Sequence, residues 1–142
     1  MTAAVGNKVP ICAGENEYTI WGFKNIVRSH AVNIINHDTV KCGGLWQAKK
    51  IAALAEVEQI LCTPHSACSE AGLEAALHLT TSTPNCAYAE IVYPTLLVMT
   101  GETPSLLVKP LELKAGIMRA SSKPRFGIEL DEKTVSKYAI RR

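Results

Sequence analysis

Short apolar runs alternate with longer amphipathic segments along most of the chain. β-Branched and other apolar residues gather in four short runs typical of buried strands, at residues 9–13, 32–35, 60–63 and 86–91. Between these runs, apolar residues recur at helical spacing in segments that begin at Thr19, run from 45 to about 58, and run from about 69 to 80. Strands that alternate with helices in this way predict an α/β fold with a parallel sheet and right-handed crossovers.

Each predicted helix has one apolar face that should pack on the sheet. Thr19 is the expected cap of the first helix. The residues expected to face inward are Ile20, Phe23, Ile26 and Val27 in the first helix, Leu45, Ala48, Ile51, Ala52 and Ala55 in the second, and Leu73, Ala76, Leu77 and Thr80 in the third.

The β/α pattern stops after Glu90. Residues 94–104 are expected to form a loop, and the alternating residues 107–118 predict a β-hairpin. Asp131 should cap a short last helix over residues 132 to about 138. We therefore expect a partial (β/α) barrel over residues 1–94 and a C-terminal loop, hairpin and helix over residues 95–142.

Composition and charge exclude several classes of partner. The 142 residues fit one domain with a formal charge of +2, and the charged pairs Lys49-Lys50 and Arg141-Arg142 are expected to be solvated. Neither nucleic acid nor a membrane is expected as a partner, since no apolar run approaches the roughly 18 residues of a spanning helix. The first residues lack the features of a signal peptide, so we expect a cytoplasmic protein.

The cysteines favour the same compartment. They stand at positions 12, 42, 62, 68 and 86, without a Cys-x-x-Cys pair, which is typical of reduced thiols in or near a core. A zinc site made by Cys62, His65 and Cys68 on one loop is an alternative. The simpler interpretation is that these thiols are small apolar side chains flanking a strand end.

One ionisable residue follows or ends each predicted strand. These residues are Glu15, Asp38, His65 and Glu90, and the steps between them are nearly equal, each with the length of one β/α unit. The carboxyl ends of neighbouring parallel strands meet at one edge of a sheet, so these four side chains should converge on one mouth. This is the arrangement expected of one arc of a (β/α) barrel, with four parallel units.

Taken singly, each of the four has a simpler interpretation. Glu15 could be a helix-start charge, and Asp38 could be a turn former that binds the amides of the loop that follows it. His65 could be a half-buried histidine with its hydrogen bonds satisfied, and Glu90 could be a surface residue of an edge strand.

Taken together, the four residues point to proton transfer. A carboxylate beside a histidine holds the imidazole in one tautomer and makes it a better base, and Asp38 and His65 are expected at matching heights on neighbouring strands. Glu90 would then hydrogen-bond a reacting oxygen, and Glu15 would bind a metal ion that positions a substrate carboxylate. Such an assembly suits removal of a proton α to a carboxylate.

These segments resemble the enolase superfamily, in its mandelate racemase subgroup. The resemblance lies in Gly-Glu-Asn-Glu-Tyr-Thr at 14–19, Asp-Thr-Val-Lys-Cys-Gly-Gly at 38–44 and Thr-Pro-His-Ser at 63–66, with further matches at 10–13, 52–56, 89–90 and 126–131. It extends from about residue 9 to the C-terminus. His37, where the family usually has proline, and Arg125-Phe126 depart from the pattern.

The resemblance implies a role for each of the four residues. Glu15 would be a carboxylate ligand of an essential Mg²⁺. Asp38 and His65 would form the dyad that acts as general base or acid. Glu90 would hydrogen-bond the substrate carboxylate as it becomes an enediolate. The implied substrates are sugar acids or 2-hydroxy acids, and the implied reactions are dehydration or racemisation, with the 14–19 run closer to the dehydratases.

The resemblance also implies parts that this chain is too short to supply. In the family, two further magnesium carboxylates, a lysine pair and a capping domain precede the position of Glu15, whereas the stretch before Glu15 here is shorter than one β/α unit. We therefore expect Mg²⁺ to bind only with ligands from elsewhere, and the chain to self-associate or to pair with a complementing N-terminal half. The alternative is a catalytically silent fragment that serves at most as a binding or assembly module.

Overall fold

The computed structural model describes residues 2–5 and 8–140, so the predicted charge pair Arg141-Arg142 lies outside the described residues. Helices and strands follow in the order α1 (Thr2–Val5), β1 (Cys12–Ala13), α2 (Thr19–Arg28), β2 (Ile34–Ile35), α3 (Leu45–Val57), β3 (Leu61–Cys62), α4 (Glu70–Thr81), α5 (Tyr93–Met99), the 3₁₀ turn η1 (Arg125–Gly127) and α6 (Glu132–Tyr138). No helix in this described part is long and apolar enough to cross a membrane.

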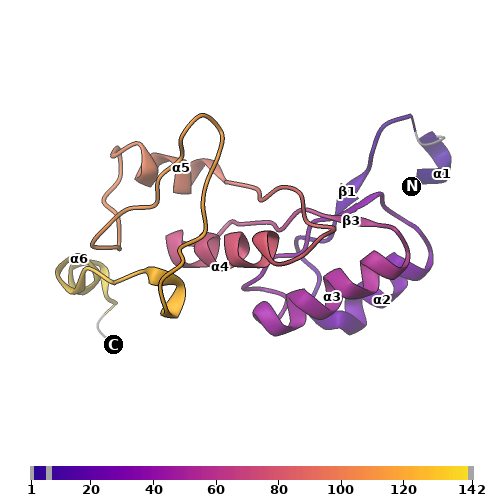
Figure 1. Cartoon of the computed structure of the whole chain (residues 1–142), viewed down its shortest axis with the longest axis horizontal. Coiled ribbons are helices and arrows are strands. Elements are labelled where there is room, and N and C mark those ends of the chain that lie inside the picture. Colours follow the sequence, from indigo (N-terminus) through magenta and orange to yellow (C-terminus); the bar gives the residue numbers. More distant parts are fainter. Residues whose placement is uncertain (1, 6–7, 141–142) are drawn as a thin grey trace.

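The three strands form one parallel sheet in the order β1-β2-β3. Each strand is shorter than the apolar run that predicts it, but each lies within that run. Helices α2 and α3 lie together beside the sheet, and α1 and α6 lie at opposite ends of the molecule (Figure 1). The predicted α/β class and the parallel order of these three strands are therefore confirmed.

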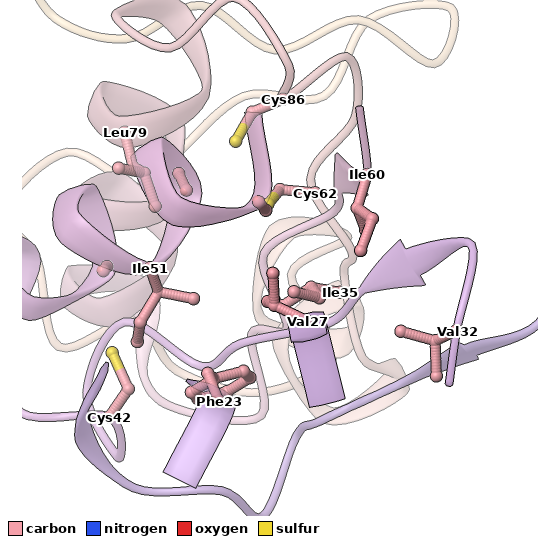
Figure 2. Close-up of a cluster of buried hydrophobic side chains, with 13 residues drawn as sticks. Phe23, Val27, Val32, Ile35, Cys42, Ile51, Ile60, Cys62, Leu79 and Cys86 are labelled. Carbon is pink, nitrogen blue, oxygen red and sulfur yellow. The ribbon is translucent and has the colours of Figure 1, made fainter. Parts of the chain in front are cut away.

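The core lies between the sheet and its helices. Ile35 of β2 and Cys62 of β3 point toward the helices and pack with Phe23 and Val27 of α2 and Ile51 of α3 (Figure 2). The opposite face of the sheet is open, as shown by Leu61, which is 51% exposed. One covered face and one open face are what an isolated arc of a (β/α) barrel presents.

The predicted helix faces are largely confirmed. The inward positions of α2, α3 and α4 are buried or partly buried, and every long predicted helix is found. The predicted cap of α2 is found in part: Tyr18 occupies the N-cap position, but Oγ1 of Thr19, the first helical residue, accepts a hydrogen bond from the Trp21 amide at 3.4 Å. The predicted cap of α6 is confirmed, since Oδ1 of Asp131 accepts a hydrogen bond from the Lys133 amide at 3.1 Å.

The fourth predicted strand is almost absent. In the described structure, its pairing with β3 consists of one parallel bridge between Cys62 and Cys86, with the Cys62 amide donating to the Asn85 carbonyl at 2.8 Å. Residues 87–92 continue without regular structure, and Tyr88 is 73% exposed. A strand at the edge of the sheet has no second neighbour to pair with, so an apolar run alone does not keep it extended.

The predicted loop at residues 94–104 is wrong, because α5 occupies Tyr93–Met99. Pro94 stands in its first turn, where proline is favoured since its fixed φ suits a helix and its missing N–H is not needed. Thr95 is buried and donates its hydroxyl to the Cys68 carbonyl at 3.1 Å. The expected division after residue 94 falls inside this helix, and it stays a prediction.

The predicted hairpin at residues 107–118 is found only at its tip. Its tip exists as a tight turn, in which Lys114 and Ile117 exchange backbone hydrogen bonds of 3.0 and 2.9 Å. The arm before the turn pairs elsewhere, because Leu107 forms an antiparallel bridge with Leu130 near the start of α6. Local alternation could not reveal this partner, which lies well beyond the end of the predicted hairpin.

Two buried glutamates of α4 hold the C-terminal segment against this helix. Glu70 accepts hydrogen bonds from the Leu111 amide at 3.2 Å and the Ser105 hydroxyl at 2.5 Å. Glu74 accepts one from the Ser121 amide at 2.8 Å. Both carboxylates are buried, Glu70 at 4% and Glu74 at 1% exposure, although charged side chains of an amphipathic helix usually lie in solvent. Helix α4 therefore packs on two sides, against the sheet and against the C-terminal segment.

Gly14 links the end of β1 to the turn before α2, in a conformation that favours glycine. Its φ is +125°, and a Cβ there would lie 2.8 Å from Cε1 of the buried Phe23. We expect Gly14→Ala to lower the free energy of unfolding by roughly 2 kcal/mol, through backbone strain and displacement of the ring. Urea unfolding followed by circular dichroism measures this loss.

Gly44→Ala is the matched control for that prediction. Gly44 also has a positive φ, of +88°, but a Cβ there would meet no heavy atom within 4 Å. The free energy of unfolding that Gly44→Ala loses should therefore come from backbone strain alone, without a steric clash. A loss at Gly44 as large as that at Gly14 would contradict the role given to Phe23.

Candidate active site

The register between β2 and β3 continues past the strands to Asp38 and His65. Ile34 pairs with Leu61 and Ile35 with Cys62, and an isolated parallel bridge then joins Asp38 to His65 at the same offset along the chain. The His65 amide donates to the His37 carbonyl at 3.1 Å. Because no residue is inserted between the strands and this bridge, the two side chains leave the sheet at the same height.

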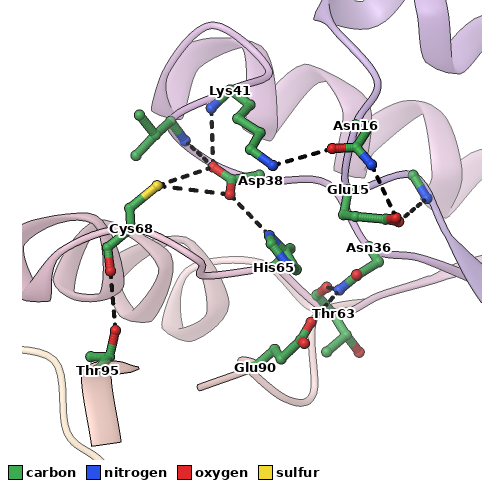
Figure 3. Close-up of polar contacts among 12 residues, drawn as sticks. Glu15, Asn16, Asn36, Asp38, Lys41, Thr63, His65, Cys68, Glu90 and Thr95 are labelled. Atoms are coloured by element: carbon green, nitrogen blue, oxygen red, sulfur yellow. Dashed lines mark hydrogen bonds and ion pairs between the residues drawn. The ribbon is translucent and has the colours of Figure 1, made fainter. Parts of the chain in front are cut away.

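The Asp38 and His65 side chains are in direct contact (Figure 3). Nδ1 of His65 lies 3.0 Å from Oδ2 of Asp38. The Asp38 side chain is 1% exposed and the His65 side chain is 13% exposed, so the carboxylate is enclosed and part of the imidazole reaches the surface. A carboxylate on Nδ1 leaves Nε2 of the neutral ring with its lone pair, which is the arrangement of a base.

Hydrogen bonds keep Asp38 charged despite its burial. Burial by itself would raise the pKa of Asp38, but hydrogen bonds from His65, Lys41 and Val40 together lower it below its usual value. The Val40 and Lys41 amides donate to Oδ1 at 2.8 and 3.0 Å. The simpler interpretation of Asp38 as a turn former is thus also correct, with one carboxylate oxygen holding the loop and the other the histidine.

Glu90 lies beside these residues and is held by its neighbours at two points. Its amide donates to the Pro64 carbonyl at 3.0 Å, one residue before His65. Its Oε2 accepts a hydrogen bond from Nδ2 of Asn36 at 3.1 Å. The structure therefore brings Glu90 to the ends of β2 and β3, close to the Asp38–His65 pair.

Glu15 stands at the end of β1 but is one residue out of step with Asp38. Cys12 pairs with Ile34 and Ala13 with Ile35, so the same register continued would set Glu15 across from the residue before Asp38. The Glu15 carboxylate accepts hydrogen bonds from the Gly14 amide at 3.2 Å and from Asn16 at 3.3 Å. The charge of Glu15 also affects the neighbouring Cys12 thiol. Partial burial raises the pKa of this thiol, and the negative charges of Glu90 and Glu15 raise it further.

The described residues do not form a metal site by themselves. They contain no group of three or more His, Cys, Asp or Glu side chains that could hold a metal ion. Mg²⁺ normally takes six oxygen ligands, and Glu15 offers one carboxylate. The alternative zinc site also finds no support here, because Cys62 is buried in the core while His65 and Cys68 lie against Asp38.

Sequence reasoning missed Asn36 and Lys41 as residues of the site, and it considered Cys68 only as a possible zinc ligand. Asn36 joins Glu90 to β3, Cys68 places its thiol 3.9 Å from both oxygens of Asp38, and Nζ of Lys41 donates to Asn16 at 3.2 Å. Burial raises the pKa of the Cys68 thiol, and the charge of Asp38 raises it further, so this thiol stays protonated. Because Asn36 and Lys41 are close to Asp38 in the sequence, they could have been suspected as site residues. The contacts of Asn36, Lys41 and Cys68 nevertheless depend on other segments of the chain.

His37 lies behind Asp38 and is fully buried. Neither ring nitrogen has a well-formed hydrogen bond in the described structure, and the ring meets Phe23 edge-on, with centroids 6.2 Å apart. Burial lowers the pKa of His37 to about 4, although the nearby Ile35 backbone and the Asp38 charge oppose this change. His37 is therefore a neutral core side chain at neutral pH.

A pocket of about 570 Å³ lies elsewhere, between α4 and the segment of residues 109–128. It includes Glu74 and Arg119 and none of the four predicted site residues. The Asp38–His65 contact is therefore not inside this pocket. It stands at the open end of the sheet.

The geometry defines a class of protein: an arc of a parallel (β/α) barrel with an Asp–His pair at the carboxyl ends of adjacent strands. Comparison with known sequences leads to the same class. The profile of the family described as "Enolase C-terminal domain-like" matches residues 1–134. The chain belongs to this family, as its resemblance to the enolase superfamily predicted.

Its relatives include sugar-acid dehydratases. A D-mannonate dehydratase of Sphingomonas sp. (strain SKA58) is 28% identical over 135 residues, covering 94% of this chain and 32% of that enzyme. A D-galactonate dehydratase of Variovorax paradoxus (strain S110) is 27% identical over 134 residues, covering 93% and 35%. The chain therefore spans about a third of the length of these curated relatives.

Solved structures agree with the fold. The mandelate racemase/muconate lactonizing enzyme-like protein of Rubrobacter xylanophilus DSM 9941 superposes with a TM-score of 0.81 at 32% identity. The match covers 94% of this chain and 33% of that protein. The α/β arrangement described above is thus similar to that of about a third of this solved protein.

Proposed function

We propose that this chain carries the acid–base part of an active site that removes a proton α to the carboxylate of a sugar acid. The observation that carries the proposal is the 3.0 Å contact between Asp38 and His65, at the end of a strand register without insertions. The names of the two curated relatives, dehydratases of D-mannonate and D-galactonate, support a sugar acid as the substrate class.

His65 is the group that moves the proton. Asp38 accepts a hydrogen bond from Nδ1–H, so Nε2 can take the α-proton of the substrate and the resulting imidazolium is stabilised by the carboxylate. For dehydration, His65 returns a proton to the β-hydroxyl, which leaves as water while the Cα–Cβ double bond forms. Glu90 would hydrogen-bond the substrate carboxylate as negative charge develops on its oxygens.

The remaining parts of such a site have to come from outside the described residues. A requirement for Mg²⁺ is expected only where further carboxylates join Glu15, since the described residues offer no metal-binding group. The open face of the sheet and its edge strand β1 support pairing with further β/α units, from a complementing N-terminal half or a second copy. These units would also supply the contacts that choose the substrate.

A second candidate function follows from the lack of a metal-binding group among the described residues. Without metal ligands of its own among the described residues, the chain alone would be catalytically silent and act as a binding or assembly module. Incubation of the purified chain in D₂O with Mg²⁺ and a panel of sugar acids separates the two. Loss of the α-proton signal in NMR supports catalysis by the chain alone, and no loss for any acid supports the second candidate, a chain that is silent by itself.

A chimera tests the proposal in a complete site. This chain would replace the corresponding third of the Variovorax paradoxus D-galactonate dehydratase, whose remaining part supplies the other strands. We expect the chimera to exchange the α-proton of D-galactonate, and His65→Asn to lower that exchange by about 10²–10⁴-fold, because asparagine cannot accept the proton. His30→Asn, at an exposed histidine paired with Glu58, is the control. Equal exchange by the His65→Asn chimera would exclude the dyad.

A further inference from the structure

Asn36 is a buried polar residue that connects Glu90 to the strand leading to His65. It follows β2 directly, two residues before Asp38, and is 8% exposed. Its Nδ2 donates to the Thr63 carbonyl at 2.7 Å and to Oε2 of Glu90 at 3.1 Å (Figure 3). Both N–H groups of one planar amide are therefore used, one on backbone and one on a carboxylate.

The register gives this amide its place. Asn36 stands across from Thr63, at the same offset along the chain that joins Asp38 to His65. Thr63 is two residues before His65, just as Asn36 is two residues before Asp38. The amide is thus anchored one step below the dyad, on the two strands that carry it.

Glu90 needs such an anchor because its own segment is irregular. No strand holds residues 87–92, and the Glu90 amide has one backbone bond, to Pro64. That bond fixes the main chain but leaves the side-chain torsions free. In the described structure, the hydrogen bond from Asn36 is the one that fixes the carboxylate.

We propose that Asn36 is a positioning residue for Glu90. By holding Oε2, it leaves Oε1 to face a substrate at the height of His65, and it favours one rotamer of a side chain that would otherwise move. This inference rests on the proposed function for its catalytic meaning, but the contact that it describes exists whether or not the chain is active.

NMR tests the contact without any activity. In chain labelled with ¹³C at glutamate carboxyl groups, the Glu90 signal is assigned through Glu90→Ala. We expect Asn36→Ala to shift this signal, because the carboxylate loses its donor. Reciprocally, Glu90→Ala should shift the side-chain amide signals of Asn36. Because Glu90 is only half-buried, we expect this variant to fold even if Asn36→Ala does not. Unchanged amide signals in Glu90→Ala would overturn the proposal.

Asn85→Ala is the matched structural control. The Asn85 amide also makes two hydrogen bonds across elements, to the carbonyls of Ala52 at 3.0 Å and Ile60 at 3.1 Å, but it does not touch Glu90. Both variants should lower stability, since Asn36→Ala removes a donor to the Thr63 carbonyl and Asn85→Ala removes a donor to the Ala52 and Ile60 carbonyls. Only Asn36→Ala should move the Glu90 signal, and a similar shift in Asn85→Ala would mean that general loosening is the cause.

The kinetic arm uses the D-galactonate dehydratase chimera. If Asn36 positions Glu90, Asn36→Ala should lower kcat for α-proton exchange by up to about 100-fold while changing KM little, because misplaced catalytic groups cost rate more than binding. Asn85→Ala should leave kcat within about two-fold, a change far below one tenfold step. An inactive chimera would count against the proposed function alone, and an active chimera with unchanged kcat in Asn36→Ala would overturn the positioning role.

Discussion

Asp38→Asn is expected to lower α-proton exchange by about 10²–10⁴-fold while leaving the chain folded. The asparagine oxygen can still accept hydrogen bonds from the Val40 and Lys41 amides, so the loop keeps its shape. Its amide nitrogen then faces Nδ1 of His65 and donates to it. This forces the hydrogen of the neutral ring onto Nε2, and the imidazole can no longer take a proton from the substrate.

Exchange into D₂O by the D-galactonate dehydratase chimera measures this loss, and circular dichroism checks the fold. Asp131→Asn is the matched control, because Asp131 accepts from the Lys133 amide two residues further on, as Asp38 does from Val40. It caps α6, outside the proposed site, so exchange should stay near the starting value. Full exchange in Asp38→Asn would show that His65 does not depend on the carboxylate.

His37→Leu is expected to remove most of the acid sensitivity of the chain between about pH 6.5 and pH 4. Burial lowers the pKa of His37 to about 4 in the folded chain, whereas an unfolded histidine titrates near 6.5. As pH falls through this range, the His37 imidazole becomes protonated in the unfolded chain but stays neutral in the folded chain. Folding should therefore lose roughly 3 kcal/mol, and leucine abolishes this loss.

Urea unfolding across this pH range tests the prediction. The full effect applies because the His37 side chain is 0% exposed and neither nitrogen has a well-formed hydrogen bond in the described structure. His30→Gln is the control, since His30 is exposed and the acid sensitivity should remain. Below about pH 4, both variants should lose stability as Asp38, whose pKa is depressed, becomes protonated. Equal loss in His37→Leu and the unaltered chain between about pH 6.5 and 4 would contradict the role given to this ring.

Local patterns predicted the elements whose partners are close in sequence. Helices α2, α3 and α4 follow from apolar spacing, because a helix buries one face whatever covers it, and α6 follows from its capping residue Asp131. The three parallel strands follow from short β-branched runs between those helices. The contact between Asp38 and His65 was predictable too, since a parallel register without insertion brings equivalent positions of adjacent strands together.

Elements that depend on distant partners were predicted less well. The proline in the first turn of α5 was a local signal that the loop prediction overlooked. The incomplete hairpin and the two-sided burial of α4 had no local signal, because Leu107 pairs with Leu130 and Glu74 binds the Ser121 amide. Such pairings depend on which segments of the whole chain can be buried together, so they cannot be predicted from the residue spacing within one segment.

Motifs and spacing along the chain are enough to assign it to the enolase C-terminal domain-like family, as a β/α arc with Asp38 and His65 at matching strand ends. The tertiary structure decided how the flanking carboxylates lie. Glu15 is one residue out of register, and Glu90 reaches the pair on an irregular segment tied to Asn36. The physical reason is that a period along the chain counts residues, whereas height at the end of a sheet depends on strand register and on the hydrogen bonds that fix each side chain.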